Sequence, residues 1–223
     1  MRVWVTRTRP GADRTADRLR ALGHEPVVQP VLEVRPLPAD LDLEGVGLLA
    51  FTSANGVSAF AALTPRRDLP VYAVGDATAA AASAAGFTEV RSAGGDVAAL
   101  SAALAASPPS GAVLHAAGRP RAGDLAASGI PVRTVELYET VPLANVPPTE
   151  IEAVLVHSPH AGRTLAAAGR RLPQVFAISE AAAAPLRTAE VQAIRVAARP
   201  DETALLALLP RDADALGANP ASG

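Results

Sequence analysis

The sequence predicts an α/β protein whose parallel sheets carry helices on both faces. The first observation behind this fold class is that short runs of branched apolar residues alternate with alanine-rich stretches as far as about Leu209. Regular alternation of strands and helices is typical of parallel sheets with crossover helices. The second observation is an internal repeat. The third is a pair of proline-rich stretches that divide the chain into two lobes.

The predicted strands are rich in valine, isoleucine and leucine, whereas the predicted helices are rich in alanine, which has the highest helix propensity. The strands are Arg2–Thr6, Pro26–Val31, Gly47–Phe51, Val71–Val74, Glu89–Arg91, Ala112–His115, Val132–Leu137, Ala153–His157, Val175–Ile178 and Ala193–Val196. The helices are Ala12–Leu22, Asn55–Ala62, Ala77–Ala85, Val97–Ala105, Arg119–Ser128, Ala161–Ala168, Ala181–Ala189 and Glu202–Leu209.

Four blocks of sequence occur twice at almost the same separation. The corresponding block starts are Val3 and Val113, Val71 and Val175, and Ser92 and Ala197, and the corresponding block ends are Phe60 and Leu165. The offsets are 113 − 3 = 110, 175 − 71 = 104, 197 − 92 = 105 and 165 − 60 = 105. Solenoid repeats have periods of about 20 to 50 residues, so this longer repeat indicates the internal duplication of a five-stranded domain.

The two proline-rich stretches, Val34–Pro38 and Val141–Pro148, are predicted linkers because proline is disfavoured in helices and in interior strands. Each follows the second strand of its repeat. The first lobe is therefore expected to be discontinuous, with residues 1–36 joined to 142–209. Residues 37–141 form the second lobe, and the two linkers run side by side. Residues 210–223 are polar and unpatterned and are predicted to be a disordered tail.

Composition and charge exclude several classes of function. The formal net charge of −2 gives no overall field that would attract nucleic acid or an anionic membrane. The chain has no cysteine, and all 20 of its basic residues are arginine, so thiolate chemistry and lysine Schiff bases are excluded. The start of the chain leads directly into a strand pattern without a signal sequence, and no long apolar run follows. We therefore expect a cytoplasmic monomer.

Several blocks resemble the uroporphyrinogen-III synthase family in their order and spacing. They are VTRTRPGADRTADRLRALGHEPVVQPVLEV near the start, then FTSANGVSAF, VYAVGDATA, GIPVRTVELYETVP and VLVHSPHAGRTL. Each block alone is a common strand–turn–helix sequence, but the ordered set covers nearly the whole chain. The resemblance implies two flavodoxin-like lobes with parallel five-stranded sheets, a two-stranded linker and an active site in the cleft between the lobes.

The resemblance also implies the reaction. Members of this family are hydro-lyases that cyclise hydroxymethylbilane, a linear tetrapyrrole, to uroporphyrinogen III. The last pyrrole, ring D, is inverted and one water is lost. The resemblance implies no metal and no organic cofactor, and the expected partner is this tetrapyrrole polycarboxylate alone.

A substrate with eight carboxylates needs local donors, because the protein itself is slightly acidic. Ligands of parallel sheets lie beyond the carboxyl ends of the strands, where helix N-termini offer free N–H groups. The same serine, threonine and asparagine residues are also ordinary helix caps. The candidate substrate-binding residues are Thr6, Arg7, Thr52, Ser53, Ala54, Asn55, Gly75, Asp76, Thr78, Gly118, Arg119, Ser158, Pro159, His160, Ser179 and Ala181.

Arg7 and Arg119 are interpreted as equivalent residues of the two repeats, each at the end of a strand. They either pair with substrate carboxylates or are solvated arginines without a role in binding. Both interpretations remain open at this point.

Tyr138 is the candidate catalytic residue, because it corresponds to the tyrosine in the YETV-like block of the family. The resemblance implies that the first chemical step expels a hydroxyl group and leaves an azafulvene cation. A phenol can donate a proton to that leaving group. The structural alternative is a half-buried tyrosine that helps the linker to pack.

One turn departs from the family. Where a Gly-Pro-Thr-Thr-like turn is usual, this chain has Ser179-Glu180-Ala181-Ala182, and Glu180 adds a negative charge. This departure motivates an alternative function, a non-catalytic tetrapyrrole- or anion-binding protein on the same scaffold. A nucleotide or flavin module is a third possibility that rests on fold analogy. His157 and His160 are three residues apart but lack a third ligand, so no zinc site is predicted.

Overall fold

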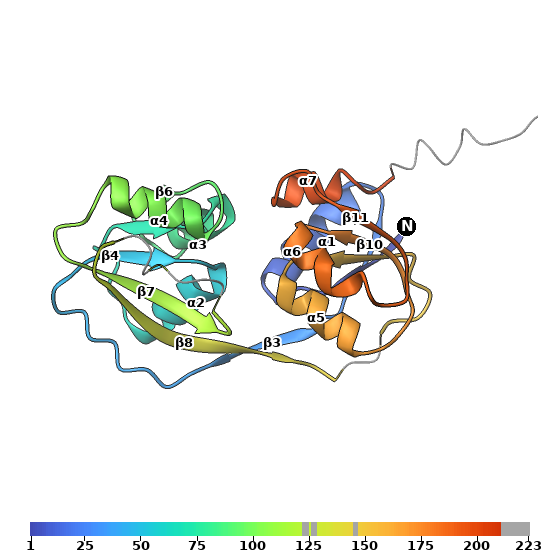
Figure 1. Ribbon diagram of the computed structural model, residues 1–223, viewed down its shortest axis with the longest axis horizontal. Helices are drawn as coiled ribbons and strands as arrows, with labels where there is room; N and C mark the ends of the chain where they lie inside the picture. Colours follow the sequence, from blue (N-terminus) through green and yellow to red (C-terminus); the bar gives the residue numbers. More distant parts are fainter. Residues whose placement is uncertain (122–124, 126–128, 145–146, 211–223) are drawn as a thin grey trace, which may run out of the picture. The chain divides into compact units, whose positions relative to one another are not determined.

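The computed structural model describes residues 1–121, 125, 129–144 and 147–210. These residues form two compact units. The first unit comprises Met1–Glu33 and the chain from Val141 onward, and the second comprises Val34–Thr140. The predicted α/β fold with parallel sheets is confirmed in each unit (Figure 1).

The first unit contains a five-stranded sheet in the order β11-β10-β9-β1-β2, in which all neighbours are parallel. Its strands are β1 (Arg2–Val5), β2 (Glu25–Val28), β9 (Ala153–Val156), β10 (Leu172–Ala177) and β11 (Val191–Val196). Its helices are α1 (Gly11–Ala21), α5 (Pro159–Ala167), α6 (Glu180–Ala183) with the 3-10 turn η2 (Ala184–Leu186), and α7 (Glu202–Leu206). Helices α1 and α7 pack on one face of the sheet, and α5 and α6 pack on the other.

The second unit contains β4 (Val46–Phe51), β5 (Val71–Ala73), β6 (Val90–Ser92), β7 (Ala112–Arg119) and β8 (Val132–Pro142). Its helices are α2 (Ala54–Leu63), α3 (Asp76–Ala84) and α4 (Val97–Ala106). One face of this sheet packs on α2 and α3 through a core that includes Phe51 and Phe60, and the other face packs on α4 through Leu100 and Leu104.

The sheet of the second unit has six strands, not the five predicted, because β8 is long enough to pair with β3 (Leu32–Pro36) as well. The strand order is β3-β8-β7-β4-β5-β6. The Leu37 N–H donates to the Leu137 carbonyl at 2.9 Å, and the Leu143 N–H donates to the Val31 carbonyl at 2.9 Å. Residue numbers rise on one strand as they fall on the other, so β3 and β8 are antiparallel. Pro36 ends β3, where a missing N–H costs least.

Two predicted helices differ in the structure. Gly118 and Arg119 were expected in a turn that opens the helix Arg119–Ser128, but both lie in strand β7; residues 122–124 and 126–128 of that prediction lie outside the described residues. The predicted helix Ala181–Ala189 is shorter because Pro185 lacks the N–H that a continuing helix needs. The predicted tail after Pro210 also lies outside the described residues.

In the part of the chain that the structure describes, every helix is too short or too polar to cross a bilayer.

Candidate functional site

A β-bulge in the middle of β8, opposite the carboxyl end of β7, sets the direction of the Tyr138 side chain. Ala117 of β7 pairs with Glu136, but the next residue, Gly118, pairs with Tyr138, so Leu137 is the extra residue. Side chains normally alternate between the faces of a strand, yet Leu137 and Tyr138 both belong to the core cluster beneath α2. Bulges redirect side chains in this way and are frequent beside active sites. The bulge thus brings the phenol to the first turn of α2.

The Tyr138 hydroxyl lies 2.6 Å from the hydroxyl of Ser53, the N-cap residue of α2. The Ser53 oxygen also accepts the Gly56 N–H at 3.0 Å. Burial raises the pKa of Tyr138 above its ordinary value of 10.0, and the hydrogen bond with Ser53 opposes that rise. The phenol therefore stays protonated throughout the neutral pH range and is available as a proton donor.

Gly118 leaves the space that the Tyr138 ring occupies. A Cβ atom at position 118 would clash with the Tyr138 Cζ atom and would lie 2.6 Å from the Tyr138 hydroxyl oxygen. Gly118 was predicted to bind substrate from a turn. In the structure it lies in a strand, and its missing side chain leaves room for the aromatic ring.

We expect Gly118→Ala to displace Tyr138 from Ser53 and to remove most of the turnover. The added methyl group also costs about 1–3 kcal/mol of stability, as overpacking typically does. Turnover per folded molecule and the unfolding free energy measure the two effects separately. Gly47→Ala is the matched control, because its Cβ would meet the Gly111 nitrogen at 2.7 Å, at the start of β4. Equal turnover in the two variants would contradict this role of Gly118.

Three predicted site serines are N-caps. Ser53 caps α2, Ser158 caps α5 by accepting the Ala161 N–H at 3.1 Å, and Ser179 caps α6 by accepting the Ala182 N–H at 3.3 Å. Their hydroxyl groups therefore hold the first helical turns in place. Ala54 and Asn55 begin α2, Pro159 and His160 begin α5, and Ala181 lies in α6.

Two of the threonines predicted to bind substrate, Thr6 and Thr78, are buried. Thr6 is fully buried, and its hydroxyl donates to the Leu155 carbonyl at 2.6 Å, which ties β1 to β9. Thr78 is also buried, in α3. Gly75 is the N-cap residue of α3, and Asp76 accepts a hydrogen bond from the Ser92 hydroxyl at 2.6 Å. These contacts describe structural roles at the carboxyl ends of the strands.

Thr52 contacts a histidine that sequence reasoning missed. The Thr52 hydroxyl lies 3.2 Å from Nε2 of His115, a buried residue of β7. His115 and Thr52 stand on neighbouring strands near their carboxyl ends, in the same unit as Tyr138. A buried polar residue within the VLHAAG run was the available signal, since histidine is costly in an apolar strand unless it has a partner.

Arg7 takes part in a polar network inside the first unit. Its guanidinium donates to Glu202 of α7 at 2.9 Å, and Glu202 also accepts hydrogen bonds from Thr15 at 2.6 Å and from Nε2 of His157 at 3.1 Å. The exposed side-chain fractions are 31% for Arg7, 19% for Glu202 and 5% for His157. The charge of Arg7 is therefore already balanced within the protein.

The network shifts three pKa values. Burial lowers the pKa of His157, against the opposing hydrogen bond with Glu202, so the imidazole is neutral and donates through Nε2. Burial alone would raise the pKa of Glu202, but the hydrogen bonds from His157 and Thr15 and the charge of Arg7 hold it at about 2. Burial also lowers the pKa of Arg7, and Glu202 opposes that shift. Glu202 is thus ionised over the whole physiological range.

Arg7 and Arg119 are not equivalent, contrary to the sequence interpretation. In the sheets, Val3 pairs with Ala153, and Val113 pairs with Leu48, so Val3 and Val113 hold the same position. Arg119 is six residues after Val113, and Arg9 is six residues after Val3, so Arg9 is the counterpart of Arg119 in the other repeat. The error arose from matching both arginines to strand ends without fixing the register.

Arg119 lies at the end of β7 and is well exposed. It donates to Glu136 Oε2 through Nε at 2.9 Å and through Nη2 at 2.5 Å. Arg121 donates to the other oxygen of Glu136 at 3.2 Å. The hydrogen bonds from Arg119 and Arg121 lower the pKa of Glu136, which stays ionised.

Glu180, the acidic residue in the altered turn, is neutralised by Arg187. Two hydrogen bonds of 2.8 Å join the guanidinium to the two carboxylate oxygens. The extra negative charge predicted for this turn is therefore compensated locally. Burial and the neighbouring Arg163 lower the pKa of His160. Among the residues that the structure describes, no three His, Cys, Asp or Glu side chains are grouped so that they could hold a metal ion.

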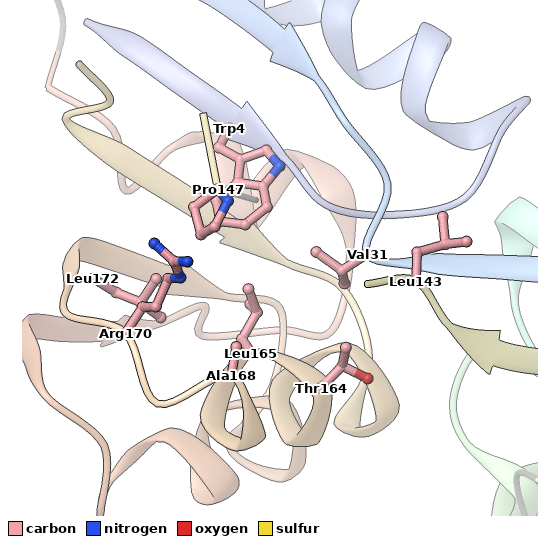
Figure 2. A pocket seen from close by; sticks show the side chains of 9 residues that line it. All are labelled: Trp4, Val31, Leu143, Pro147, Thr164, Leu165, Ala168, Arg170 and Leu172. Carbon is pink, nitrogen blue, oxygen red and sulfur yellow. The ribbon is translucent and has the colours of Figure 1, made fainter. Parts of the chain in front are cut away.

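A separate apolar pocket lies inside the first unit (Figure 2). Its lining residues are Trp4, Val31, Leu143, Pro147, Thr164, Leu165, Ala168, Arg170 and Leu172. None of the predicted site residues lines it. Among the described residues that line it, Arg170 is the charged one, and the Trp4 indole N–H already donates to the Gln29 carbonyl at 2.7 Å. The pocket therefore offers apolar surface and few groups suited to a polycarboxylate.

The fold and the site define a class of protein: parallel α/β units, each with polar turns and helix caps that follow its strands, and in the second unit a largely buried phenol. The family model for uroporphyrinogen-III synthase HemD matches residues 13–207. The chain belongs to the uroporphyrinogen-III synthase family, as its sequence blocks suggested. Its function is therefore the hydro-lyase reaction of that family, the cyclisation of hydroxymethylbilane to uroporphyrinogen III.

Solved structures show the same fold. A uroporphyrinogen-III synthetase from Helicobacter pylori is 18% identical, with a TM-score of 0.63, over 96% of this chain and 98% of that chain. A mutant uroporphyrinogen III synthase from the extremely thermophilic bacterium Thermus thermophilus is 18% identical, with a TM-score of 0.50, over 93% of this chain and 97% of that chain. No curated protein matches the sequence significantly.

Proposed function

We propose that Tyr138, held by Ser53, donates the proton that lets the hydroxyl group of hydroxymethylbilane leave as water. The observation that carries this proposal is the 2.6 Å contact between the two hydroxyl groups. Because the Ser53 oxygen already accepts the Gly56 N–H, its own hydrogen is free to bond to the Tyr138 oxygen. The phenolic hydrogen can then point toward the substrate.

The proposed step balances in atoms and charge. The C–O bond of the hydroxymethyl group breaks, the leaving hydroxyl takes the phenolic proton, and the substrate becomes an azafulvene cation. The resulting phenolate is stabilised by the Ser53 hydroxyl and by the positive end of α2. Attack of the substituted carbon of the last pyrrole gives a spiro intermediate, which rearranges to the inverted ring. The proton lost in restoring the final pyrrole returns to Tyr138.

Main-chain donors at the capped helices are proposed to fold the substrate before it closes. Ser53 of α2 and Ser158 of α5 fix the first turns of helices whose N–H groups suit carboxylates. Holding a long chain in one shape lowers the entropic part of the barrier.

The experiment that tests this function is product analysis. Purified protein is incubated with freshly made hydroxymethylbilane, and the products are oxidised to porphyrins and separated by isomer. We expect the III isomer to dominate. The spontaneous reaction gives the I isomer, so exclusive formation of the I isomer would defeat the proposal. Tight binding of the substrate without turnover would instead favour the non-catalytic alternative, which family membership does not favour.

We also propose that the two units are flavodoxin-like lobes related by duplication. The support is their shared strand order: β2-β1-β9-β10-β11 in one unit corresponds to β8-β7-β4-β5-β6 in the other. The registers correspond as well, since Val175 pairs with Val154 as Val71 pairs with Leu49. In chain order the sheet of the first unit reads second-first-third-fourth-fifth, which is the flavodoxin-like order. The second unit has the same order when its strands are numbered as in the repeat, with β7 first and β8 second.

A further inference from the structure

Glu136 differs from the carboxylates of two other surface ion pairs because it meets two guanidinium groups. Arg119 occupies one of its oxygens and Arg121 the other. Asp68 and Glu180, by contrast, are each paired with one arginine, Arg66 and Arg187 respectively. The cluster of Arg119, Arg121 and Glu136 therefore carries a net charge of one positive unit in a protein whose formal charge is −2.

The two arginines of this cluster retain donors that the protein does not use. A guanidinium has five N–H donors, of which Arg119 uses its Nε and Nη2 positions and Arg121 uses Nε. The other N–H groups have no partner among the described residues. Arg119 and Arg121 side chains are 60% and 49% exposed, whereas Glu136 is 22% exposed. Glu136 is thus the more buried member of the cluster, and it holds two guanidinium groups whose side chains are about half exposed or more.

The cluster lies close to Tyr138 on the paired strands β7 and β8. Arg119 is the last residue of β7, directly after Gly118, over which the Tyr138 ring lies. Glu136 is two residues before Tyr138 on β8. Both groups therefore stand at the carboxyl end of the same strand pair, the end at which ligands of parallel sheets bind. In the first unit Arg9, the counterpart of Arg119, pairs with the carboxylate of Asp13 at 2.7 Å.

We propose that Arg119 and Arg121 form a subsite for carboxylate side chains of the tetrapyrrole, with Glu136 as the residue that positions both guanidinium groups. This inference deepens the proposed function and rests on it. Arginine suits the task because its planar donors match a carboxylate in a bidentate arrangement. The second unit would then supply both the proton donor and the charge that selects an anionic substrate.

Steady-state kinetics with hydroxymethylbilane tests the subsite through charge changes of opposite sign. We expect Arg121→Gln to raise KM about fivefold, with kcat unchanged, because an exposed charge contributes to binding and not to the chemical step. We expect Glu136→Gln to change KM less than Arg121→Gln does, because glutamine keeps one of the two acceptor oxygens that position the guanidinium groups and also removes a competing negative charge. The KM of the unmodified protein should rise with salt more steeply than that of Arg121→Gln.

Arg66→Gln is the control, because Arg66 is 46% exposed and paired with Asp68 in the segment before β5, at the opposite end of the strands. If the KM of Arg121→Gln equals the KM of Arg66→Gln, the proposal is overturned. A rise in KM for Glu136→Gln as large as that for Arg121→Gln also overturns it, because a merely structural contact would be lost in both. The dissociation constant of uroporphyrin III, a stable octacarboxylate, reports on the subsite even if the chain makes no III isomer.

Discussion

Replacing Tyr138 with phenylalanine is expected to lower kcat by about 100-fold or more, the usual contribution of a positioned general acid. The ring of phenylalanine fits the space above Gly118, so the fold should be retained. The hydroxyl that Ser53 holds at 2.6 Å is the single group removed. We expect the slow product to remain the III isomer, because the shape of the bound substrate decides the isomer. Consumption of hydroxymethylbilane and isomer separation measure the two quantities.

Tyr72→Phe is the matched control, since Tyr72 is the other tyrosine of the chain. Its hydroxyl accepts a hydrogen bond from exposed Arg91 at 3.2 Å, and its ring lies under the same guanidinium. Turnover of Tyr72→Phe should match that of the unmodified protein. If Tyr138→Phe also keeps its full rate, Tyr138 has no part in the mechanism, although the fold assignment stands.

Replacing Glu202 with glutamine is expected to cost about 3 kcal/mol of stability at pH 7, in the range found when one member of a buried ion pair is removed. Glutamine keeps the size of the side chain but leaves the partly buried charge of Arg7 without its partner. Denaturant unfolding of the two proteins measures the difference. Glu180→Gln is the control, because Glu180 also begins a helix and pairs with an arginine, but is 63% exposed. Exposed pairs contribute about 0–1 kcal/mol.

The stability that Glu202 contributes should depend on pH in a defined direction. Its pKa is about 2 in the folded protein, against 4.5 for the ordinary carboxyl group. A group whose folded pKa is depressed contributes fully above its unfolded pKa and loses that contribution as pH falls through the folded value. The difference between the unmodified protein and Glu202→Gln should therefore be constant above about pH 5 and shrink between 4.5 and 2. A difference that stays constant down to pH 2 would contradict the ion-pair account.

The arrangement of strands and helices was largely predictable because it depends on local patterns. Apolar runs mark β1, β4 and β9, and alanine-rich stretches mark the helices between them. Strand β3 was predicted as one of two extended linkers side by side and not as a member of a sheet, because its sequence, LEVRP, resembles a linker and gains its pairing only from β8. Pro185 ended α6 earlier than the alanine content suggested. Both differences reflect one residue or one partner outweighing local propensity.

Tyr138 was predictable as a candidate, but its setting was not. The bulge at Leu137 depends on the register between β7 and β8, which sequence patterns do not fix at a single residue. Ser53 was predicted as a helix cap and a substrate ligand, whereas its contact with the tyrosine joins positions 85 residues apart. The role of Gly118 follows only from the position of the aromatic ring.

The Arg7–Glu202 network could not be predicted from the repeat. The two residues are 195 positions apart, and the repeat places valine, Val97, where Glu202 stands. Long-range charge pairs of this kind leave no periodic signal in a single sequence. The contrast between Arg7, which pairs with Glu202, and the two arginines that share Glu136 therefore emerges from the three-dimensional pairing alone.

The most direct test of proton donation by Tyr138 is the solvent isotope effect on a single turnover of hydroxymethylbilane. We predict that the unmodified protein consumes the substrate more slowly in D₂O than in H₂O, because the phenolic proton moves as the C–O bond breaks. In Tyr138→Phe the residual rate should show a much smaller effect. Equal isotope effects in the two proteins would contradict the account.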